Sequence, residues 1–222
     1  MLTRLTDGAV AVLVGAQQAL AENWSPTPAL CQNAHDLLTE GRSALVQTDG
    51  GEEIFVRAYP PPLCLWVAGA VPIAHVLVPM ARLAGFVAAA IDPRAAFQDA
   101  GRQAGLDVIA GWPAEILTRL GVDGGSAVIT LFHDPKLDDP ALVAALRTPA
   151  FYIGALGSTR SHAARLDRLQ RQGVDAAHRA RIHGPVGLAL GGRTSSDIAV
   201  AILAHLVQER NGTIRSRLEG MM

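Results

Sequence analysis

Residues 63–74 read LCLWVAGAVPIA, a short apolar run followed by a glycine turn and then by a helical pattern. An apolar run of this length is typical of a strand that is buried on both faces of a parallel sheet. In the dinucleotide-binding pattern G-x-G-x-x-G/A, Gly69 and Ala74 take the first and third places, with Ala70 between strand and helix. Asp92 has the place of the acid that binds ribose about twenty residues further on. The stretch therefore predicts the first strand–turn–helix of a nucleotide-binding fold.

The phosphate-binding part of this turn departs from the pattern. Val71 stands where a second glycine would let a pyrophosphate approach the backbone, and Pro72 removes an N–H donor at the helix start. We therefore expect the nucleotide-binding fold but only weak binding of NAD or NADP. An NAD(P)-dependent oxidoreductase stays an alternative function, although no positioned acid/base pair accompanies it.

Strand-like and helical patterns alternate along most of the chain. Strands are expected at 63–68, 86–91, 106–109, 126–132 and 150–154, and helices at 73–84, 95–104, 113–120, 140–146 and 160–172, the last with its arginines on the outer face. This alternation predicts an α/β fold, a doubly wound, Rossmann-like parallel sheet with its ligand crevice at the carboxyl ends of the strands. Thr194 and Asp197 have the spacing of a capping box, and the helix after them is expected to stop near Arg210 and Gly212.

A small α+β piece is expected before this domain. Val10, Leu13 and Val14 share one helical face, which predicts an amphipathic helix that breaks at 24–28. A second helix is expected over 30–39, and a hairpin of 43–47 and 53–58 around Asp49-Gly50. Because residues 59–62 form a proline-rich linker, we expect a helix–hairpin segment at 1–59 and the Rossmann-like domain at 60–222.

Composition narrows the function classes. Half of the residues are hydrophobic and the net charge is −1, without blocks of like charge, so we expect a sizeable core and no nucleic-acid surface. No apolar run approaches the roughly 20 residues that span a membrane. Cys31 and Cys64 show no metal-binding spacing and belong to different expected elements, so we predict no disulfide between them and a reduced, cytoplasmic setting.

Two further turns carry polar groups at predicted strand ends. The turn that begins at Gly154 could point N–H groups at an anion, since its next residues are Gly157, Ser158, Thr159 and Arg160 at a helix start. A plain turn that Ser158 or Thr159 caps fits the pattern equally well. His133 and Asp134 end the preceding strand and would face the same crevice, unless Asp134 only starts a turn.

Six stretches together resemble one family in order and spacing. They are Gly69-Ala70 with Asp92-Pro93-Arg94, then 133–138 (HDPKLD), 152–158 (YIGALGS), 181–188 (RIHGPVGL), 191–194 (GGRT) and 197–202 (DIAVAI). They are similar to the XdhC/CoxI family of xanthine dehydrogenase accessory factors, chiefly its C-terminal Rossmann-type domain, over about Ser43 to Gly212. The resemblance implies an accessory protein that binds the molybdenum cofactor and helps its maturation and insertion into a xanthine dehydrogenase-type molybdenum hydroxylase. It also implies a cytoplasmic homodimer.

This resemblance, together with the turns, predicts a cofactor-binding set and neither a catalytic nor a metal-binding residue. Arg160 is expected to pair with the cofactor's phosphate, and Arg193 is a weaker addition. A ligand-free adaptor for the hydroxylase is the other alternative. The expected set is Gly69, Ala70, Asp92, Arg94, His133, Asp134, Gly154, Gly157, Ser158, Thr159, Arg160 and Arg193.

The chain differs from the family pattern in two places. The family's first turn usually reads GAGHVA, where Val71 and Pro72 stand here. Its N-terminal module, with GS-x-P-R and GGG segments, is largely missing. We therefore expect either a separate N-terminal XdhC-module partner or the loss of part of the activity.

Overall fold

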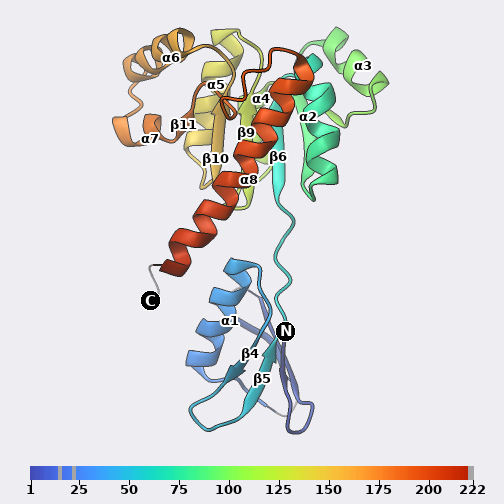
Figure 1. The fold of residues 1–222 in the computed structure, drawn as a ribbon, viewed down its shortest axis with the longest axis vertical. Helices are drawn as coiled ribbons and strands as arrows, with labels where there is room; N and C mark the ends of the chain where they lie inside the picture. The colour runs from blue at the N-terminus through green and yellow to red at the C-terminus, as the bar shows by residue number, and fades with distance from the viewer. Residues whose placement is uncertain (15–16, 22–23, 220–222) are drawn as a thin grey trace. The chain divides into compact units, whose positions relative to one another are not determined.

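The computed structural model describes residues 1–14, 17–21 and 24–219 and forms two compact units, Met1–Pro61 and Pro62–Met222 (Figure 1). Each unit has its own hydrophobic core and is described by itself.

The N-terminal unit is an antiparallel sheet with one helix. Its strands follow the order β3-β2-β1-β5-β4, with bounds β1 Leu2–Arg4, β2 Val10–Val14, β3 Gln17–Ala21, β4 Ala44–Gln47 and β5 Glu53–Val56. Helix α1, Pro28–Glu40, begins at Thr27, whose Oγ1 accepts the N–H of Leu30, and ends at Gly41 with a φ of 66°. Leu30, Ala34 and Leu37 of α1 are buried in one core with Ile54 and Val56 of the sheet.

The predicted helix at Val10–Val14 is wrong, whereas the helix after residue 27 and the hairpin of β4 and β5 are confirmed. All five residues are apolar, and Ala11 and Leu13 are the ones that pack into the core, so the segment fits a period of two as well as a helical face. Pairing decides between them, because β2 forms antiparallel ladders with both β1 and β3. The N-terminal piece thus contains a five-stranded sheet, and the predicted helix–hairpin segment accounts for only part of it.

The C-terminal unit confirms the predicted doubly wound parallel sheet. Its order is β11-β10-β9-β6-β7-β8, and its strands are β6 Cys64–Ala68, β7 Val87–Asp92, β8 Val108–Ala110, β9 Ser126–Thr130, β10 Tyr152–Ala155 and β11 Ile182–His183. Each pairing is parallel. The order reverses between β6 and β9, which is the place where such sheets open a ligand crevice.

Helices cover both faces of this sheet. The helices α2 Pro72–Leu83, α3 Ala95–Gln103 and α8 Ser195–Glu219 share one core, and α2 and α8 lie side by side (Figure 1). The other core contains α4 Pro113–Arg119, α5 Pro135–Leu146 and α6 Thr159–Arg171. No helix within the described part of the chain is long and apolar enough to cross a membrane.

Three details differ from the sequence-based expectation. Helix α5 begins at Pro135 and not near Pro140, because the Asp134 carboxylate accepts the Lys136 N–H at 2.9 Å and starts the helix. The short elements α7, Ala176–Ala180, and β11 were not predicted. Helix α8 continues past Gly212 to Glu219.

The start of α8 confirms the capping box. Thr194 Oγ1 accepts the N–H of Asp197 at 3.1 Å, and the Asp197 carboxylate accepts the N–H groups of Thr194 at 3.0 Å and Arg193 at 3.2 Å.

Candidate anion-binding site

The first turn is fastened by a buried carboxylate. Asp92 has no exposed surface, and it accepts the N–H of Ala70 at 2.9 Å and that of Arg94 at 3.0 Å. The Arg94 guanidinium adds two bonds, from Nε at 2.9 Å and Nη2 at 2.8 Å. Both oxygens of Asp92 are therefore occupied by protein donors, and a ribose hydroxyl would have to displace one of them.

Arg94 connects the first turn to the end of β9. Its guanidinium lies 3.6 Å from the ring centroid of Phe97 and 4.9 Å from that of Phe132. The hydrogen bonds from Arg94 to Asp92 raise the pKa of its guanidinium, which keeps it charged. Gly69 has a φ of 118°, and an added Cβ there would contact Leu131 and Phe132 at 3.5 Å. The predicted residues of the first turn thus lie beside the β9 end.

The start of α2 offers few phosphate donors. Val71 precedes the helix without a side-chain cap, packs partly against the core, and is followed by Pro72 in the first turn. The expectation of weak NAD(P) binding stays a prediction, and the occupied oxygens of Asp92 agree with it.

The second turn contains two glycines with different tasks. Gly154 lies within β10, where an added Cβ would collide with Val186 and Tyr152, so its small size serves packing. Gly157 has a φ of 144°, and a Cβ there would collide with the hydroxyl of Ser161. A residue with a side chain is strained at Gly157 for both reasons.

The helix start at Ser158 leaves several backbone donors open. Ser158 caps α6, since its Oγ accepts the Ser161 N–H at 3.1 Å. Among the described residues, no acceptor is bonded to the N–H groups of Gly157, Ser158, Thr159 and Arg160. Such donors at a helix start, with the helix dipole behind them, attract an anion. The side chains of Ser158, Thr159 and Arg160 are exposed beside them.

A buried arginine lies one turn further along α6. Arg165 is 4% exposed, and its Nη2 donates to the Leu156 carbonyl at 2.8 Å and lies 3.9 Å from Asp138 Oδ2. Its Nε and Nη1 are buried and have no hydrogen-bond partner within the part of the chain that the structure describes. A buried guanidinium with open donors is costly unless a ligand or water satisfies it.

Arg165 lines a cavity of about 150 Å³. Its lining residues come from the start of α5 and from α6: His133, Pro135, Asp138, Ser161, Ala164, Arg165 and Arg168. Arg168 is already paired with Asp139 by two bonds of 2.6 and 3.0 Å. Arg165 is therefore the lining cation whose donors remain available.

Asp138 is the opposing charge in this cavity. It is 2% exposed, and one oxygen accepts the Phe132 N–H at 3.3 Å. Burial raises the pKa of Asp138, against the opposing effect of the Arg165 charge. Its carboxyl thus takes up a proton more readily than an exposed one, which would lessen its repulsion of an incoming anion.

The sequence-predicted residues are not all brought together. His133, with a φ of 61°, is exposed at the rim of the cavity, and Asp134 caps α5 behind it. Gly154 is inside a strand and Arg193 joins the start of α8. Of the predicted residues, His133 lines the cavity, whereas residues 157–160 do not belong to its lining.

The family follows from comparison with known proteins. The family model of the XdhC Rossmann domain matches residues 65–206, well over half of the chain. The chain belongs to the XdhC family.

Relatives of this XdhC chain have longer sequences. It is 37% identical over 89 residues to the molybdenum cofactor insertion chaperone PaoD of Escherichia coli K12, covering 40% of this chain and 28% of PaoD. It is 36% identical over 74 residues to the uncharacterized protein YqeB of the same strain, covering 33% of this chain and 14% of YqeB. The chain thus spans less than a third of either relative.

A solved structure shares the XdhC fold. It is a Bacillus halodurans protein described as a xanthine dehydrogenase, with a TM-score of 0.68 at 24% identity, covering 97% of this chain and 59% of that one. At this identity the likeness concerns the fold.

Sequence reasoning missed Arg165, although Asp138 ended one of the family motifs. The arginines of α6 were all expected on its outer face, but Arg165 and Leu169 are the buried residues of this helix. Their spacing of four places them on one side of the helix. The spacing of four between Arg165 and Leu169 was therefore the signal in the sequence that could have predicted a buried arginine.

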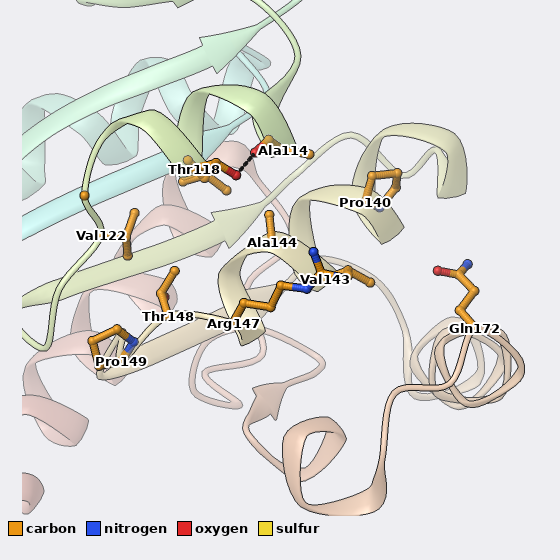
Figure 2. Close-up of a pocket in the computed structure, with 12 residues that line it drawn as sticks. Ala114, Thr118, Val122, Pro140, Val143, Ala144, Arg147, Thr148, Pro149 and Gln172 are labelled. Carbon is orange, nitrogen blue, oxygen red and sulfur yellow. Dashed lines mark hydrogen bonds between the residues drawn. The ribbon is translucent and has the colours of Figure 1, made fainter.

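A larger hollow of the XdhC domain lies elsewhere. A cavity of about 590 Å³ opens between α4 and α5, where Figure 2 shows Ala114, Thr118, Val143 and Ala144 around it. Val122 and Pro149 at its other side precede β9 and β10, so it lies toward the amino ends of these strands. Arg147 is its charged lining residue, and we do not assign the anion site there.

Proposed function

We propose that this chain is an accessory protein that binds the molybdenum cofactor and helps its maturation and insertion into a xanthine dehydrogenase-type molybdenum hydroxylase. The membership in the XdhC family supports this role. The similarity to a protein named as a molybdenum cofactor insertion chaperone supports the identity of the ligand.

One observation carries the assignment of the binding site. The N–H groups before and at the start of α6 are open, and Arg165 of the same helix has an unpaired Nε and Nη1. The Arg165 guanidinium lies near this turn, since a Cβ added at Gly157 would be 3.8 Å from its Nη2. The molybdenum cofactor has a terminal phosphate, and backbone N–H groups together with a guanidinium are the donors that a phosphate prefers. The residues present therefore fit the anionic end of this ligand.

Each group has a task in the proposed complex. The N–H groups of residues 157–160 would hold the phosphate. The unpaired donors of Arg165 would form hydrogen bonds with the same phosphate. Arg160 is exposed at the second helical position and would add a charge-assisted hydrogen bond. His133 at the rim of the cavity would face the pterin end.

The experiment compares cofactor retention by variants of α6. Arg160→Ala should lower the affinity roughly ten- to a hundredfold, since a lost charge-assisted hydrogen bond costs about 1.5–3 kcal/mol. Arg171→Ala, an exposed arginine at the far end of the same helix, is the matched control and should retain the cofactor. Equilibrium gel filtration with purified molybdenum cofactor measures both.

A second variant tests the buried cation. Arg165→Met keeps an unbranched side chain that can stay buried and removes the charge. Circular dichroism should show a folded protein, and its cofactor retention should be much weaker. Wild-type protein that retains no cofactor, or a folded Arg165→Met protein that retains it fully, would refute the proposed site.

The proposal includes the setting of the protein. We propose a cytoplasmic homodimer whose client is the hydroxylase, with a separate N-terminal XdhC-type module as a further partner. Co-purification from cells that produce all three proteins tests both partners, and analytical ultracentrifugation tests the dimer. If the hydroxylase co-purifies with the wild type but not with Arg160→Ala, the hydroxylase recognises the chain only when the cofactor is bound.

A further inference from the structure

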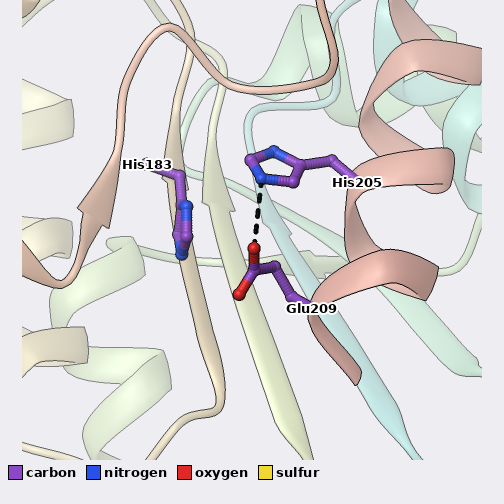
Figure 3. Close-up of side chains that lie close together, drawn as sticks. All are labelled: His183, His205 and Glu209. Carbon is purple, nitrogen blue, oxygen red and sulfur yellow. Dashed lines mark ion pairs between the residues drawn. The ribbon is translucent and has the colours of Figure 1, made fainter. Parts of the chain in front are cut away.

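Three side chains with metal-ligating atoms meet on the face of the sheet that α8 covers. His205 and Glu209 are four residues apart on α8, so they project from the same side of the helix. His183 is the last residue of β11. One ligating atom from each residue lies within 4.8 Å of the other two. Figure 3 shows His205 and Glu209 extending from the helix toward His183.

This cluster is separate from the proposed phosphate site. Tyr152, which contacts both histidines, belongs to the core shared with α2 and α8. Leu169 of α6, the helix that carries Arg165, belongs to the core on the other face. Neither histidine lines the cavity of Arg165.

The distances suit a small ion. His205 Nε2 lies 3.5 Å from Glu209 Oε1. Two ligands of a tetrahedral zinc ion at bonds of about 2.0–2.1 Å are separated by roughly 3.4 Å. The rings of His183 and His205 are nearly perpendicular, at 87°, with centroids 4.9 Å apart. Small side-chain rotations would bring the third ligand to the same distance.

Tyr152 positions both imidazoles from the sheet. Its hydroxyl lies 2.9 Å from His205 Nδ1, and its ring stacks on His183 at 4.5 Å with an angle of 5°. A partner on the second ring nitrogen is what orients a ligating histidine in metal sites. With Nδ1 engaged, Nε2 is the atom that remains to face Glu209 and an ion.

We propose that His183, His205 and Glu209 bind one divalent transition metal ion of the class that prefers imidazole and carboxylate, with Zn²⁺ as its representative. Two histidines and one glutamate leave a coordination position for water or another ligand. The ion would connect α8 to the edge strand β11. This site goes beyond the proposed cofactor binding and does not depend on it.

The test uses the full chain after dialysis against a chelator, titrated with ZnCl₂ by calorimetry. We expect one Zn²⁺ per chain, bound at least tenfold more weakly by His205→Asn and by Glu209→Gln. His178→Asn is the matched control, because His178 pairs with Asp175 on α7 and has no third ligand within the described clusters. It should bind like the wild type.

Two further readings separate a metal site from a hydrogen-bonded Tyr152–His205–Glu209 chain. Zn²⁺ should raise the melting temperature of the wild type and leave that of folded Glu209→Gln unchanged. Tyr152→Phe should bind Zn²⁺ roughly ten- to a hundredfold more weakly, as loss of an orienting partner does. Absence of Zn²⁺ binding, or equal binding by all variants, would overturn the proposal. Arg160→Ala should keep Zn²⁺, so this site and the cofactor site fail independently.

Discussion

Replacing Asp92 by alanine tests whether this residue holds the first turn together. The change leaves the buried Ala70 N–H without its acceptor and removes four bonds of 2.8–3.0 Å. A buried N–H left without its acceptor costs about 1–3 kcal/mol, whereas Arg94, whose side chain is 35% exposed, can be solvated by water. In a domain of this size, that corresponds to a fall of roughly 2–12 °C in the melting temperature.

Asp107 provides the matched control. It also pairs with an arginine, Arg82, at 2.6 Å, but its side chain is 82% exposed. Arg82 keeps its bonds to the Ala88 carbonyl when Asp107 is removed. Asp107→Ala should therefore cost about 0–1 kcal/mol.

Urea unfolding of both variants, followed by circular dichroism, measures the difference. Asp92→Asn, which keeps the shape and one acceptor oxygen, should fall between the wild type and Asp92→Ala. If Asp92→Ala and Asp107→Ala lose the same free energy of unfolding, Asp92 does not fasten the turn and our interpretation of the first turn is wrong.

Three other predictions follow from single residues. NAD and NADP should bind weakly or not at all, and calorimetry should show better binding by Val71→Gly; micromolar binding by the wild type contradicts this. Gly157→Ala should destabilise the start of α6 by about 1–3 kcal/mol, because its φ of 144° and the Ser161 hydroxyl both oppose a Cβ; an unchanged urea midpoint would argue against that strain. Burial, and then the charge of Arg165, lowers the pKa of His162, so the unfolded chain binds its proton more readily and stability falls as the pH drops below about 6.5. His162→Gln should lose less stability than the wild type between pH 7 and pH 5, and an equal loss would count against this cause.

The parallel sheet could be predicted because its signals are local. Leu65 and Val67 are fully buried within one continuous apolar run, as a central strand requires. Gly69 and Asp92 stand at the ends of neighbouring strands, where the fold needs a tight turn and a carboxylate. Right-handed crossovers then limit the strand orders that such a sheet can adopt.

The N-terminal sheet could not be predicted in the same way. The segment Val10–Val14 becomes a strand through its ladders with β1 and β3, and those partners are visible only after folding. Strand β11 has two residues, too few for a periodic pattern. Pairing with β10 defines it.

The two clusters on which our proposals rest were also hidden from the sequence. Arg165 meets Asp138 across 27 positions of the chain, and His183 meets His205 across 22. Along the chain, only the spacing of four between Arg165 and Leu169 and between His205 and Glu209 was visible. Side chains from separate elements become a site through packing, which no local pattern records.

The two glycine turns of this domain now differ in what they can hold. At the first turn, Pro72 removes a donor and Asp92 is satisfied by Arg94, so the polar groups there stabilise the protein itself. At the second turn, the helix start is open, and Nε and Nη1 of Arg165 have no hydrogen-bond partner among the described residues. Both turns lie at the carboxyl end of the same sheet, with β9 between β6 and β10. Replacement of the usual Gly-His by Val71-Pro72 therefore shifts the expected anion site across β9 and leaves the fold intact.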